Sequence, residues 1–124
     1  NAGFTAGEPW IGTGDNYADI NVEQALADPD SVFYAYQQLI ALRKSQPVLT
    51  WGDYQDLLPE HPSLWCYRRQ HERQTLLVVA NLSADPQDWQ PPTGSTDGKV
   101  LMSNYDTPAG ITLRPFEAIW WLQG

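Results

Sequence analysis

Apolar residues recur with the period of an α-helix over residues 31–45 of the chain. Arg43 and Lys44 fall in the last turn, where positive charge stabilises a helix C-terminus. Pro47 cannot continue the helix, so the pattern predicts a helix over residues 30–46. Its apolar arc covers nearly half of the circumference and comprises Val32, Phe33, Tyr36, Leu39, Ile40 and Leu42. An arc this wide predicts that the helix packs against more than one surface.

After Pro47, short apolar stretches alternate with turn residues at intervals of about ten residues, the spacing typical of a β-sandwich or barrel. The stretch at 74–82 is apolar on both faces, which predicts a central strand that is covered on both sides. Residues 83–98 and 104–110 are predicted loops, the first anchored by Trp89. Strands are expected near residues 48–51, 54–58, 63–69, 74–82, 98–103, 111–114 and 117–123. The sequence therefore predicts a mainly-β domain built as an antiparallel β-sandwich.

The last predicted strand has two apolar faces. We interpret one of them as the core face, which carries Phe116, Ala118, Trp120 and Leu122. The other face carries Glu117, Ile119, Trp121 and Gln123. This second face is too apolar to be left in water. We therefore expect one flank of the helix to cover it near Ile119 and Trp121.

The first thirty residues are acidic and irregular, with six carboxylates, four glycines and no Lys or Arg. Asn21 precedes Val22–Ala27 and has Gln24 three positions later, an arrangement that caps a short helix. A long stretch without regular structure is typical of a functional loop or of a segment that lies on another surface. We favour the second interpretation.

Composition excludes two classes of partner. The formal net charge of −8 leaves too few Lys and Arg residues for nucleic acid or for an anionic membrane surface. The longest apolar run, Leu76–Ala80, is far shorter than a membrane span. The one cysteine, Cys66, excludes an internal disulfide and is typical of a reducing compartment, so we expect a cytoplasmic protein.

No catalytic constellation is visible, and we predict no catalytic, substrate-binding or metal-binding residue and no cofactor. Most acidic residues lie in predicted loops, whereas glycoside hydrolysis needs two carboxyl groups held about 5–10 Å apart on a rigid scaffold. His61 and His71 have no partners at zinc-ligand spacing and are predicted to be surface residues. Four residues of calcium-ligand type lack the spacing of a calcium loop: Asp15, Asn16, Asp19 and Asn21.

Two further motifs are interpreted as structural. Cys66 is predicted to be a buried, inert thiol, since no histidine is placed to activate it. Asn81-Leu82-Ser83 matches a glycosylation acceptor, and we interpret the match as chance.

The six tryptophans raise the question of sugar binding, because exposed aromatic rings stack on sugar rings. Strand positions favour core packing for Trp51, Trp65 and Trp120. The other three are left open between core packing and contact with sugar: Trp10, Trp89 and Trp121.

Several segments together resemble the carboxyl-terminal end of the α-glucosidases of glycoside hydrolase family 13. They cover nearly the whole chain in the family's order: NAGFT, PWI, DNYADINVEQALADPDSVF, YQQLIALRKSQPVLTWGDY, LLVVANLS, SNYD and LRPFEAIWW. Within the family, YQDLLPEHPSLWCYRR and the IWWLQ ending are most similar to the members that hydrolyse trehalose 6-phosphate. Oligo-1,6-glucosidases and dextran glucosidases share the general plan and are less similar in these two segments.

The resemblance implies that the chain is a piece of a longer enzyme. Residues 1–46 would be the end of a catalytic (β/α)8 barrel, with residues 31–45 as its final helix, and residues 47–124 would be the C-terminal β-sandwich. The family's nucleophilic Asp, acid/base Glu and third Asp belong to barrel segments before Asn1, so no catalytic residue carries over. The implied parent is a retaining cytoplasmic glycosidase that cleaves trehalose 6-phosphate to glucose and glucose 6-phosphate. This chain would be inactive by itself and would stabilise the barrel.

Two alternatives stay open: the same region of an oligo-1,6-glucosidase or dextran glucosidase, and a free-standing carbohydrate-binding or protein-interaction sandwich. The expected partner is the missing barrel of the same chain. Without the barrel, we expect the exposed flank of the helix to self-associate through residues 31–45, to be covered by residues 1–30, or to fray. Recognition of the parent's phosphate would need Arg or Lys side chains, and nothing in the sequence singles out one of those present.

Overall fold

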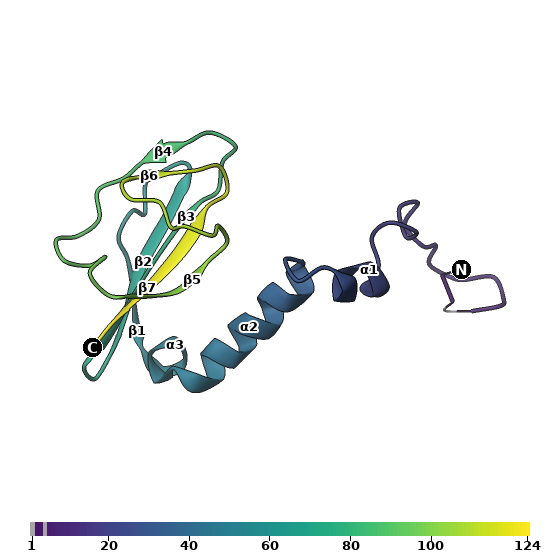
Figure 1. Cartoon of the computed structure of the whole chain (residues 1–124), viewed down its shortest axis with the longest axis horizontal. Coiled ribbons are helices and arrows are strands. Elements are labelled where there is room, and N and C mark those ends of the chain that lie inside the picture. Colours follow the sequence, from purple (N-terminus) through teal and green to yellow (C-terminus); the bar gives the residue numbers. More distant parts are fainter. Residues whose placement is uncertain (1, 4) are drawn as a thin grey trace. The chain divides into compact units, whose positions relative to one another are not determined.

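The computed structural model describes residues 2–3 and 5–124, so Asn1 and Phe4 of the opening NAGFT segment lie outside the described residues. The described chain divides into two compact units, one ending at Leu42 and the other covering Arg43–Gly124. Figure 1 labels the helices and strands of both units.

Turns and bends occupy most of the described chain before α1, as the glycines of this stretch predict. Helix α1 covers Val22–Ala27. Asn21 caps it, because Asn21 Oδ1 accepts a hydrogen bond of 2.9 Å from the backbone N–H of Gln24. The predicted short capped helix is confirmed.

Helix α2 covers Val32–Ser45 and confirms the helix predicted from the apolar period. Two side-chain hydrogen bonds tie its start to α1. The Ser31 hydroxyl donates to the Ala25 carbonyl at 2.6 Å, and the Tyr34 hydroxyl donates to the Leu26 carbonyl at 3.1 Å. None of the described residues of α2 is buried.

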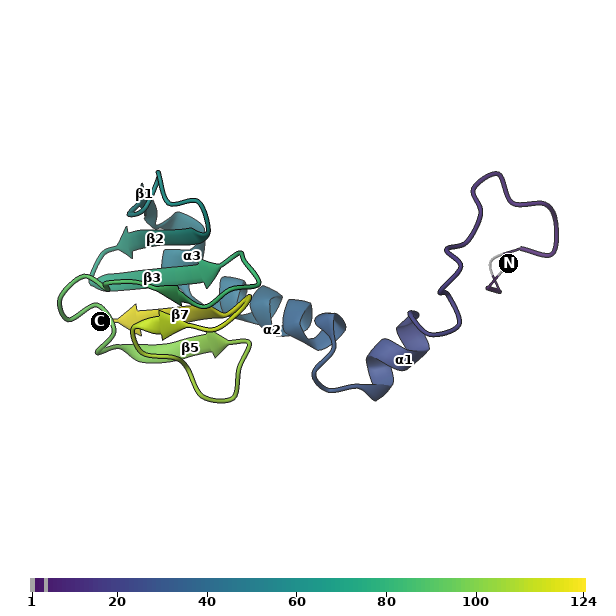
Figure 2. The ribbon, with the colours of Figure 1, turned by 90° about the horizontal axis from the view of Figure 1, so that it is seen from above.

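A five-stranded antiparallel sheet with the order β1-β2-β3-β7-β5 forms the centre of the second unit, and Figure 2 shows these strands side by side. The strands are β1 (Asp53–Asp56), β2 (Leu64–His71), β3 (Gln74–Asn81), β5 (Lys99–Ser103) and β7 (Ala118–Gln123). A separate two-stranded sheet pairs β4 (Gln87–Asp88) with β6 (Thr112–Leu113). The predicted mainly-β, antiparallel fold is confirmed, although β4 falls in a stretch predicted to be a loop.

Strand β3 is the central strand of the large sheet, paired with β2 on one side and β7 on the other. All four residues from Leu76 to Val79 are buried, which confirms the prediction that both faces of this strand are covered. One face contributes to a buried cluster of Leu64, Cys66, Leu77, Val79, Trp89, Leu113, Ile119 and Trp121. Because Trp89 follows β4 and Leu113 lies in β6, the small sheet is the second layer over this face.

The segment predicted as a strand at 48–51 is instead a short helix, α3 (Pro47–Trp51). Pro47 stands in the first helical turn, where its fixed φ and missing N–H suit a helix. Val48 and Leu49 are buried, and α3 contacts β2 and β3. A Cβ on Gly52 would lie 2.5 Å from the Val48 carbonyl oxygen, so the residue that ends α3 has to be glycine. The prediction was wrong because so short an apolar run does not distinguish the period of a helix from that of a strand.

The two faces of β7 are the reverse of the prediction. Ile119 and Trp121 belong to the buried cluster, whereas Ala118, Trp120 and Leu122 are only half-buried, and Phe116, which precedes β7, is 60% exposed. The residues packed with Ile119 and Trp121 include Trp89 and Leu113, so the prediction that a flank of the helix covers them is wrong. The cause is the small sheet, whose two short strands leave little trace in the apolar pattern.

Candidate functional site

The described residues contain no group of three or more His, Cys, Asp or Glu side chains that could hold a metal ion. His61 has a structural task, because its Nδ1 accepts hydrogen bonds from the backbone N–H groups of Ser63 at 3.1 Å and Leu64 at 2.9 Å. Asn21, one of the residues of calcium-ligand type, is committed to capping α1. Neither side chain is therefore free to start a metal site.

Cys66 is 1% exposed and lies in the buried cluster. Burial, with a smaller contribution from the negative charge of Asp56, raises the pKa of the thiol to about 12. The thiolate is the reactive form of cysteine, so we expect this side chain to be unreactive at neutral pH. The predicted burial of Cys66 is confirmed, and its lack of reactivity stays a prediction.

The glycosylation match at Asn81 is not available in the folded chain. Asn81 is 2% exposed, and its Nδ2 donates to the carbonyl oxygens of Asp85 at 2.8 Å and Arg114 at 2.9 Å. Its Oδ1 accepts from the backbone N–H of Ser83 at 3.0 Å. Both amide hydrogens and the amide oxygen are thus used to hold the segment that follows β3 and the segment between β6 and β7.

The tryptophans divide differently from the prediction. Trp51 is 72% exposed and Trp65 is 47% exposed, so the prediction that these two pack in the core is wrong, and Trp120 is half-buried. Trp89 and Trp121, which had been left open, are both buried and stack with ring centroids 5.9 Å apart. Trp89 Nε1 also donates to the Gly110 carbonyl at 3.1 Å. Both of these rings therefore pack in the core.

The one carboxylate that is fully buried among the described acids is Glu117. Its Oε1 accepts from Ala109 N at 2.9 Å and Arg114 Nη2 at 2.6 Å, and its Oε2 accepts from Arg114 N at 2.9 Å and Nε at 3.0 Å. Burial opposes ionisation, but these N–H donors outweigh it and hold the pKa of Glu117 below its usual range. The guanidinium of Arg114 lies 3.9 Å from the centroid of the Tyr105 ring and donates to the Thr107 carbonyl. This carboxylate holds a loop together and is saturated with donors, so it is not placed for catalysis.

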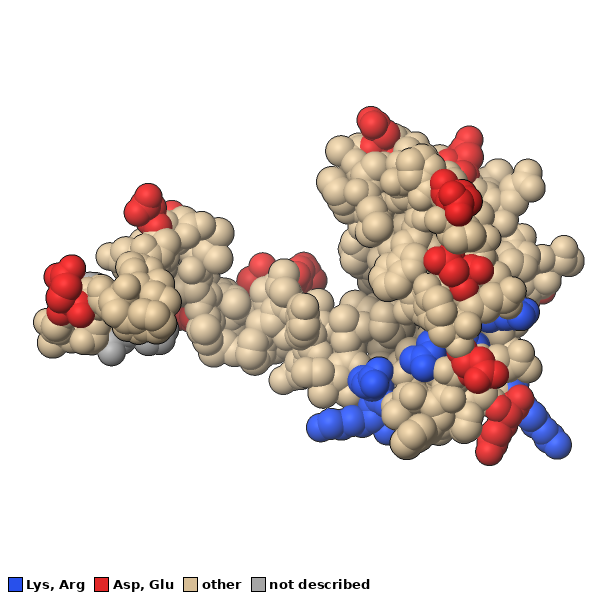
Figure 3. All heavy atoms as spheres, turned by 180° about the vertical axis from the view of Figure 1, so that it is seen from behind, with Lys and Arg blue, Asp and Glu red and all other residues tan. Residues whose placement is uncertain are grey.

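Basic residues occur only from Arg43 onwards. On the face seen in Figure 3, Lys and Arg side chains gather at one end of the second unit, while Asp and Glu side chains occur in both units. Arg69 donates to the carbonyls of Leu49 at 2.5 Å and Gly52 at 2.6 Å, and Arg68 donates to Gln55 at 2.6 Å. These arginines stabilise the junction of α3, β1 and β2, and do not converge on one anion.

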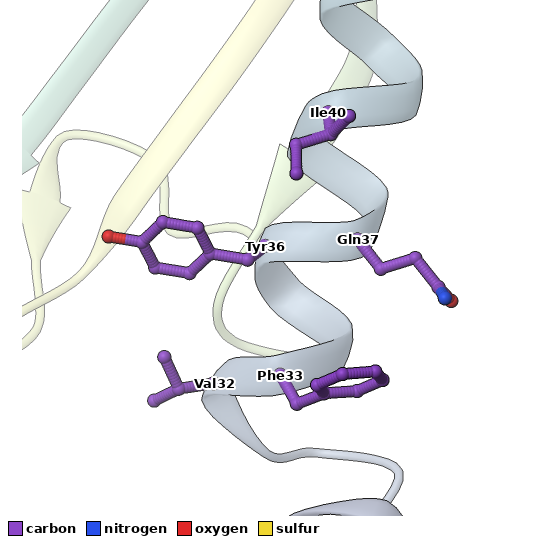
Figure 4. Close-up of a pocket in the computed structure, with 5 residues that line it drawn as sticks. All are labelled: Val32, Phe33, Tyr36, Gln37 and Ile40. Atoms are coloured by element: carbon purple, nitrogen blue, oxygen red, sulfur yellow. The ribbon is translucent and has the colours of Figure 1, made fainter.

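One exposed apolar surface is the helix face, defined as Val32, Phe33, Tyr36 and Ile40 of α2. These side chains are 72%, 41%, 64% and 52% exposed and line a shallow pocket together with Gln37. Figure 4 shows Val32 and Tyr36 projecting to one side of the helix and Phe33 to the other. A surface of this kind is typical of a contact with another protein segment.

Another exposed surface is the aromatic strip, defined as Tyr54, Trp65 and Tyr67 on β1 and β2. Trp65 and Tyr67 lie with ring centroids 5.0 Å apart, and Tyr54 and Tyr67 lie 5.3 Å apart. Trp65 Nε1 donates to the Tyr54 hydroxyl at 3.2 Å. Burial raises the pKa of the Tyr67 phenol, against a smaller lowering by Arg69. Sequence reasoning missed this strip because it assigned Trp65 to the core.

Both parts of the chain match known sequence families. The alpha amylase catalytic domain matches residues 1–52, and the maltogenic amylase C-terminal domain matches residues 54–120, more than half of the chain. In the described part of the chain, no helix is long and apolar enough to cross a membrane.

The relatives are sugar-cleaving enzymes. The chain is 62% identical to trehalose-6-phosphate hydrolase of Escherichia coli and 46% identical to oligo-1,6-glucosidase of Heyndrickxia coagulans, in each case over 99% of its length. It superposes on the crystal structure of trehalose-6-phosphate hydrolase from Bacillus licheniformis with a TM-score of 0.87 and 42% identity, over 98% of the chain. In all three it spans only 22–23% of the other protein. The chain thus belongs to glycoside hydrolase family 13, the α-amylase family, and carries its C-terminal domain.

Proposed function

We propose that the chain is the non-catalytic C-terminal part of a longer, cytoplasmic trehalose-6-phosphate hydrolase. That enzyme cleaves trehalose 6-phosphate to glucose and glucose 6-phosphate with retention of configuration. The observation that supports trehalose 6-phosphate as the substrate is the 62% identity to the Escherichia coli trehalose-6-phosphate hydrolase, against 46% identity to the oligo-1,6-glucosidase. Retaining hydrolysis uses two carboxyl groups about 5 Å apart, and we place both in the segment that precedes residue 1.

In this proposal residues 1–46 are the end of the catalytic barrel and residues 47–124 are the C-terminal domain. The catalytic-domain family matches residues 1–52 and the C-terminal-domain family matches residues 54–120, which supports a division close to this boundary. The helix face supports a role for the first part, because the described residues leave the apolar side chains of Val32 and Tyr36 largely exposed to water. We propose that it packs against the rest of the barrel and so stabilises the enzyme.

Substrate preference is tested with the full-length enzyme. The expected result is a kcat/KM for trehalose 6-phosphate that exceeds those for trehalose and isomaltose. Trehalose is the control for the contribution of the phosphate. A preference for isomaltose contradicts the proposal and identifies the enzyme as an oligo-1,6-glucosidase.

The supporting role is tested at the helix face. Tyr36→Asp in the full-length enzyme places a charge in the proposed contact and is expected to lower the temperature of half-inactivation. Gln38→Asp introduces the same charge on the opposite side of α2 and is the matched control, with little change expected. Equal effects of the two substitutions contradict the contact. The chain alone is expected to show no turnover of trehalose 6-phosphate or of a nitrophenyl α-glucoside.

A further inference from the structure

The second unit carries a pocket of about 630 Å³ at the edge of the buried cluster, which we call the His61 pocket. Because Leu64 faces that cluster and Trp65 faces the other way, the pocket lies on the opposite side of β2 from the aromatic strip. Small-molecule sites have volumes of this order and combine an apolar lining with a few polar groups. The apolar part of the lining is Leu58, Leu64, Trp89 and Ile111, and the polar part is His61, Asp88 and Gln90.

Hydrogen bonds fix the two segments that form the walls. In the connection between β1 and β2, Leu58 N donates to Asp56 Oδ1 at 3.0 Å, and His61 N donates to the Leu58 carbonyl at 3.0 Å. In the small sheet, Trp89 N donates to the Ile111 carbonyl at 2.9 Å, next to the pairing of β4 with β6. The pocket is thus preformed, and a ligand does not have to order it.

His61 is a hydrogen-bond donor with a defined tautomer. Its Nδ1 accepts from the backbone N–H groups of Ser63 and Leu64, so it carries no proton. The ring is therefore neutral and has its proton on Nε2. In the described part of the chain, no hydrogen bond from Nε2 is present, so a ligand in the pocket can supply the acceptor.

Asp88 and Gln90 add acceptors to this donor. Asp88 Oδ1 accepts from the Thr112 hydroxyl at 2.7 Å, which orients the carboxylate. Asp88 Oδ2 and the Gln90 side-chain amide make no hydrogen bond with another described residue, and both side chains are exposed. The pocket therefore offers an N–H donor, a carboxylate oxygen and an amide that can both donate and accept.

The apolar lining and the charge of the pocket limit the class of ligand. Ile111 is 67% exposed and Leu58 is half-buried, so part of the apolar lining is open to a ligand. A sugar ring has apolar C–H faces and hydroxyl groups that both donate and accept, which matches this combination. Among the described lining residues Asp88 is the one with a charge, and no Lys or Arg is present to bind a phosphate. Asp88 repels a phosphorylated sugar but not a neutral one.

We infer that the His61 pocket binds the glucose ring of a neutral sugar. His61 Nε2 donates to one hydroxyl, Asp88 Oδ2 accepts from another, and Ile111 packs against a C–H face of the ring. The choice of glucose rests on the proposed function, in which hydrolysis releases one neutral and one phosphorylated glucose. The ring is small and makes few hydrogen bonds, so the expected Kd is in the millimolar range.

Photolabelling of the full-length enzyme tests the inference. The probe is an α-thioglucoside that carries a diazirine on its aglycone and resists hydrolysis at the sulfur linkage. Photolysis followed by peptide mass spectrometry is expected to place label on the segments around His61 and Ile111. Methyl α-glucoside at about ten times its Kd should reduce this labelling about tenfold, and glucose 6-phosphate at the same concentration should leave it unchanged.

Three results would overturn the inference. Label only on segments that precede residue 1 would show that no sugar binds in the pocket, and would leave the proposed function intact. Label at the pocket that methyl α-glucoside does not reduce would be nonspecific. Equal protection by glucose 6-phosphate would contradict a neutral sugar. Conversely, a preference for isomaltose as substrate, together with protected label at the pocket, would contradict the proposed function alone.

Substitutions at two exposed lining residues provide a second measurement, the Kd of methyl α-glucoside from competition with the probe. Asp88→Ala removes a charged acceptor and should raise this Kd about tenfold, and Ile111→Ala removes apolar contact and should raise it about fivefold. Asp85→Ala is the matched control, because Asp85 is also an exposed acid and does not line the pocket. Equal Kd values for the Asp88 and Asp85 variants would contradict the assigned contacts.

Discussion

Replacement of Glu117 by Gln tests how the loop before β7 is stabilised. The substitution keeps the shape of the side chain and replaces one oxygen of a buried carboxylate by an NH2 group. Whichever oxygen is kept, one buried backbone N–H, of Ala109 or of Arg114, then faces another donor and loses its acceptor. We expect Glu117→Gln to destabilise the second unit.

The magnitude follows from the four N–H groups that bind Glu117. One buried N–H without an acceptor costs about 2 kcal/mol, and loss of the charge from the remaining hydrogen bonds costs about 1 kcal/mol more. The Arg114 side chain is 40% exposed and can hydrogen-bond to water instead of Glu117. The loss of its ion pair is therefore not added to the free-energy cost. The expected loss is therefore about 3 kcal/mol in the free energy of unfolding.

Urea unfolding of the chain, followed by tryptophan fluorescence, measures this loss. With an m-value of about 1.5 kcal/mol/M for a unit of this size, the midpoint should fall by about 2 M. The exposed Glu60 is the matched control, and Glu60→Gln should change the stability by less than about 0.5 kcal/mol. A loss at Glu117 no larger than that at Glu60 would refute the reasoning.

The pH dependence gives an independent check with a definite sign. The folded-state pKa of Glu117 is lowered, so its contribution is complete above the unfolded-state pKa of about 4.3 and is lost as the pH falls through the folded-state value. The difference between the unaltered chain and Glu117→Gln should be constant at neutral pH and should shrink below about pH 4. A difference that persists at lower pH would contradict this assignment.

Three further outcomes are expected. Cys66 should react with a thiol reagent at pH 8 only after urea unfolding, because burial raises its pKa to about 12; rapid labelling of the folded chain would be inconsistent with that burial. Trp89→Ala should reduce the free energy of unfolding by about 3–5 kcal/mol, whereas Trp10→Ala, at a side chain that is 94% exposed, should change it by less than about 0.5 kcal/mol. Asn81→Asp should cost about 2–4 kcal/mol in urea unfolding, because it removes two buried N–H donors; a stability near that of the unaltered chain would contradict the hydrogen bonds assigned to this amide.

Elements fixed by nearby residues could be predicted from the sequence. Asn21 and Gln24 are three positions apart and cap α1 regardless of the rest of the chain. The apolar run of β3 required a central strand, and α2 has enough residues to display its period. The helix face could be anticipated for the same reason, since its arc is visible in the sequence.

Features fixed by distant residues could not be predicted in this way. Ile119 and Trp121 are buried because Trp89, about thirty residues earlier, packs on the same cluster, and alternation alone leaves both faces of β7 apolar. The aromatic strip was missed for the same reason, because β2 is apolar on both faces over Leu64–Tyr67. One signal could have revealed it: Trp65 and Tyr67 alternate with Leu64 and Cys66, so both sets cannot occupy one core.

The place of β7 in the sheet has a consequence for synthesis on the ribosome. β7 ends at Gln123, yet it lies between β3 and β5, and β5 pairs with no other described strand. Until Ala118–Gln123 leave the exit tunnel, the apolar strand β3 has an open edge and β5 has no partner. The hairpin of β2 and β3 can form early, but the sheet is complete only when β7 lies between β3 and β5. During elongation the unpaired edge of β3 is thus exposed to other chains, and the large sheet is completed only by the last strand of the domain.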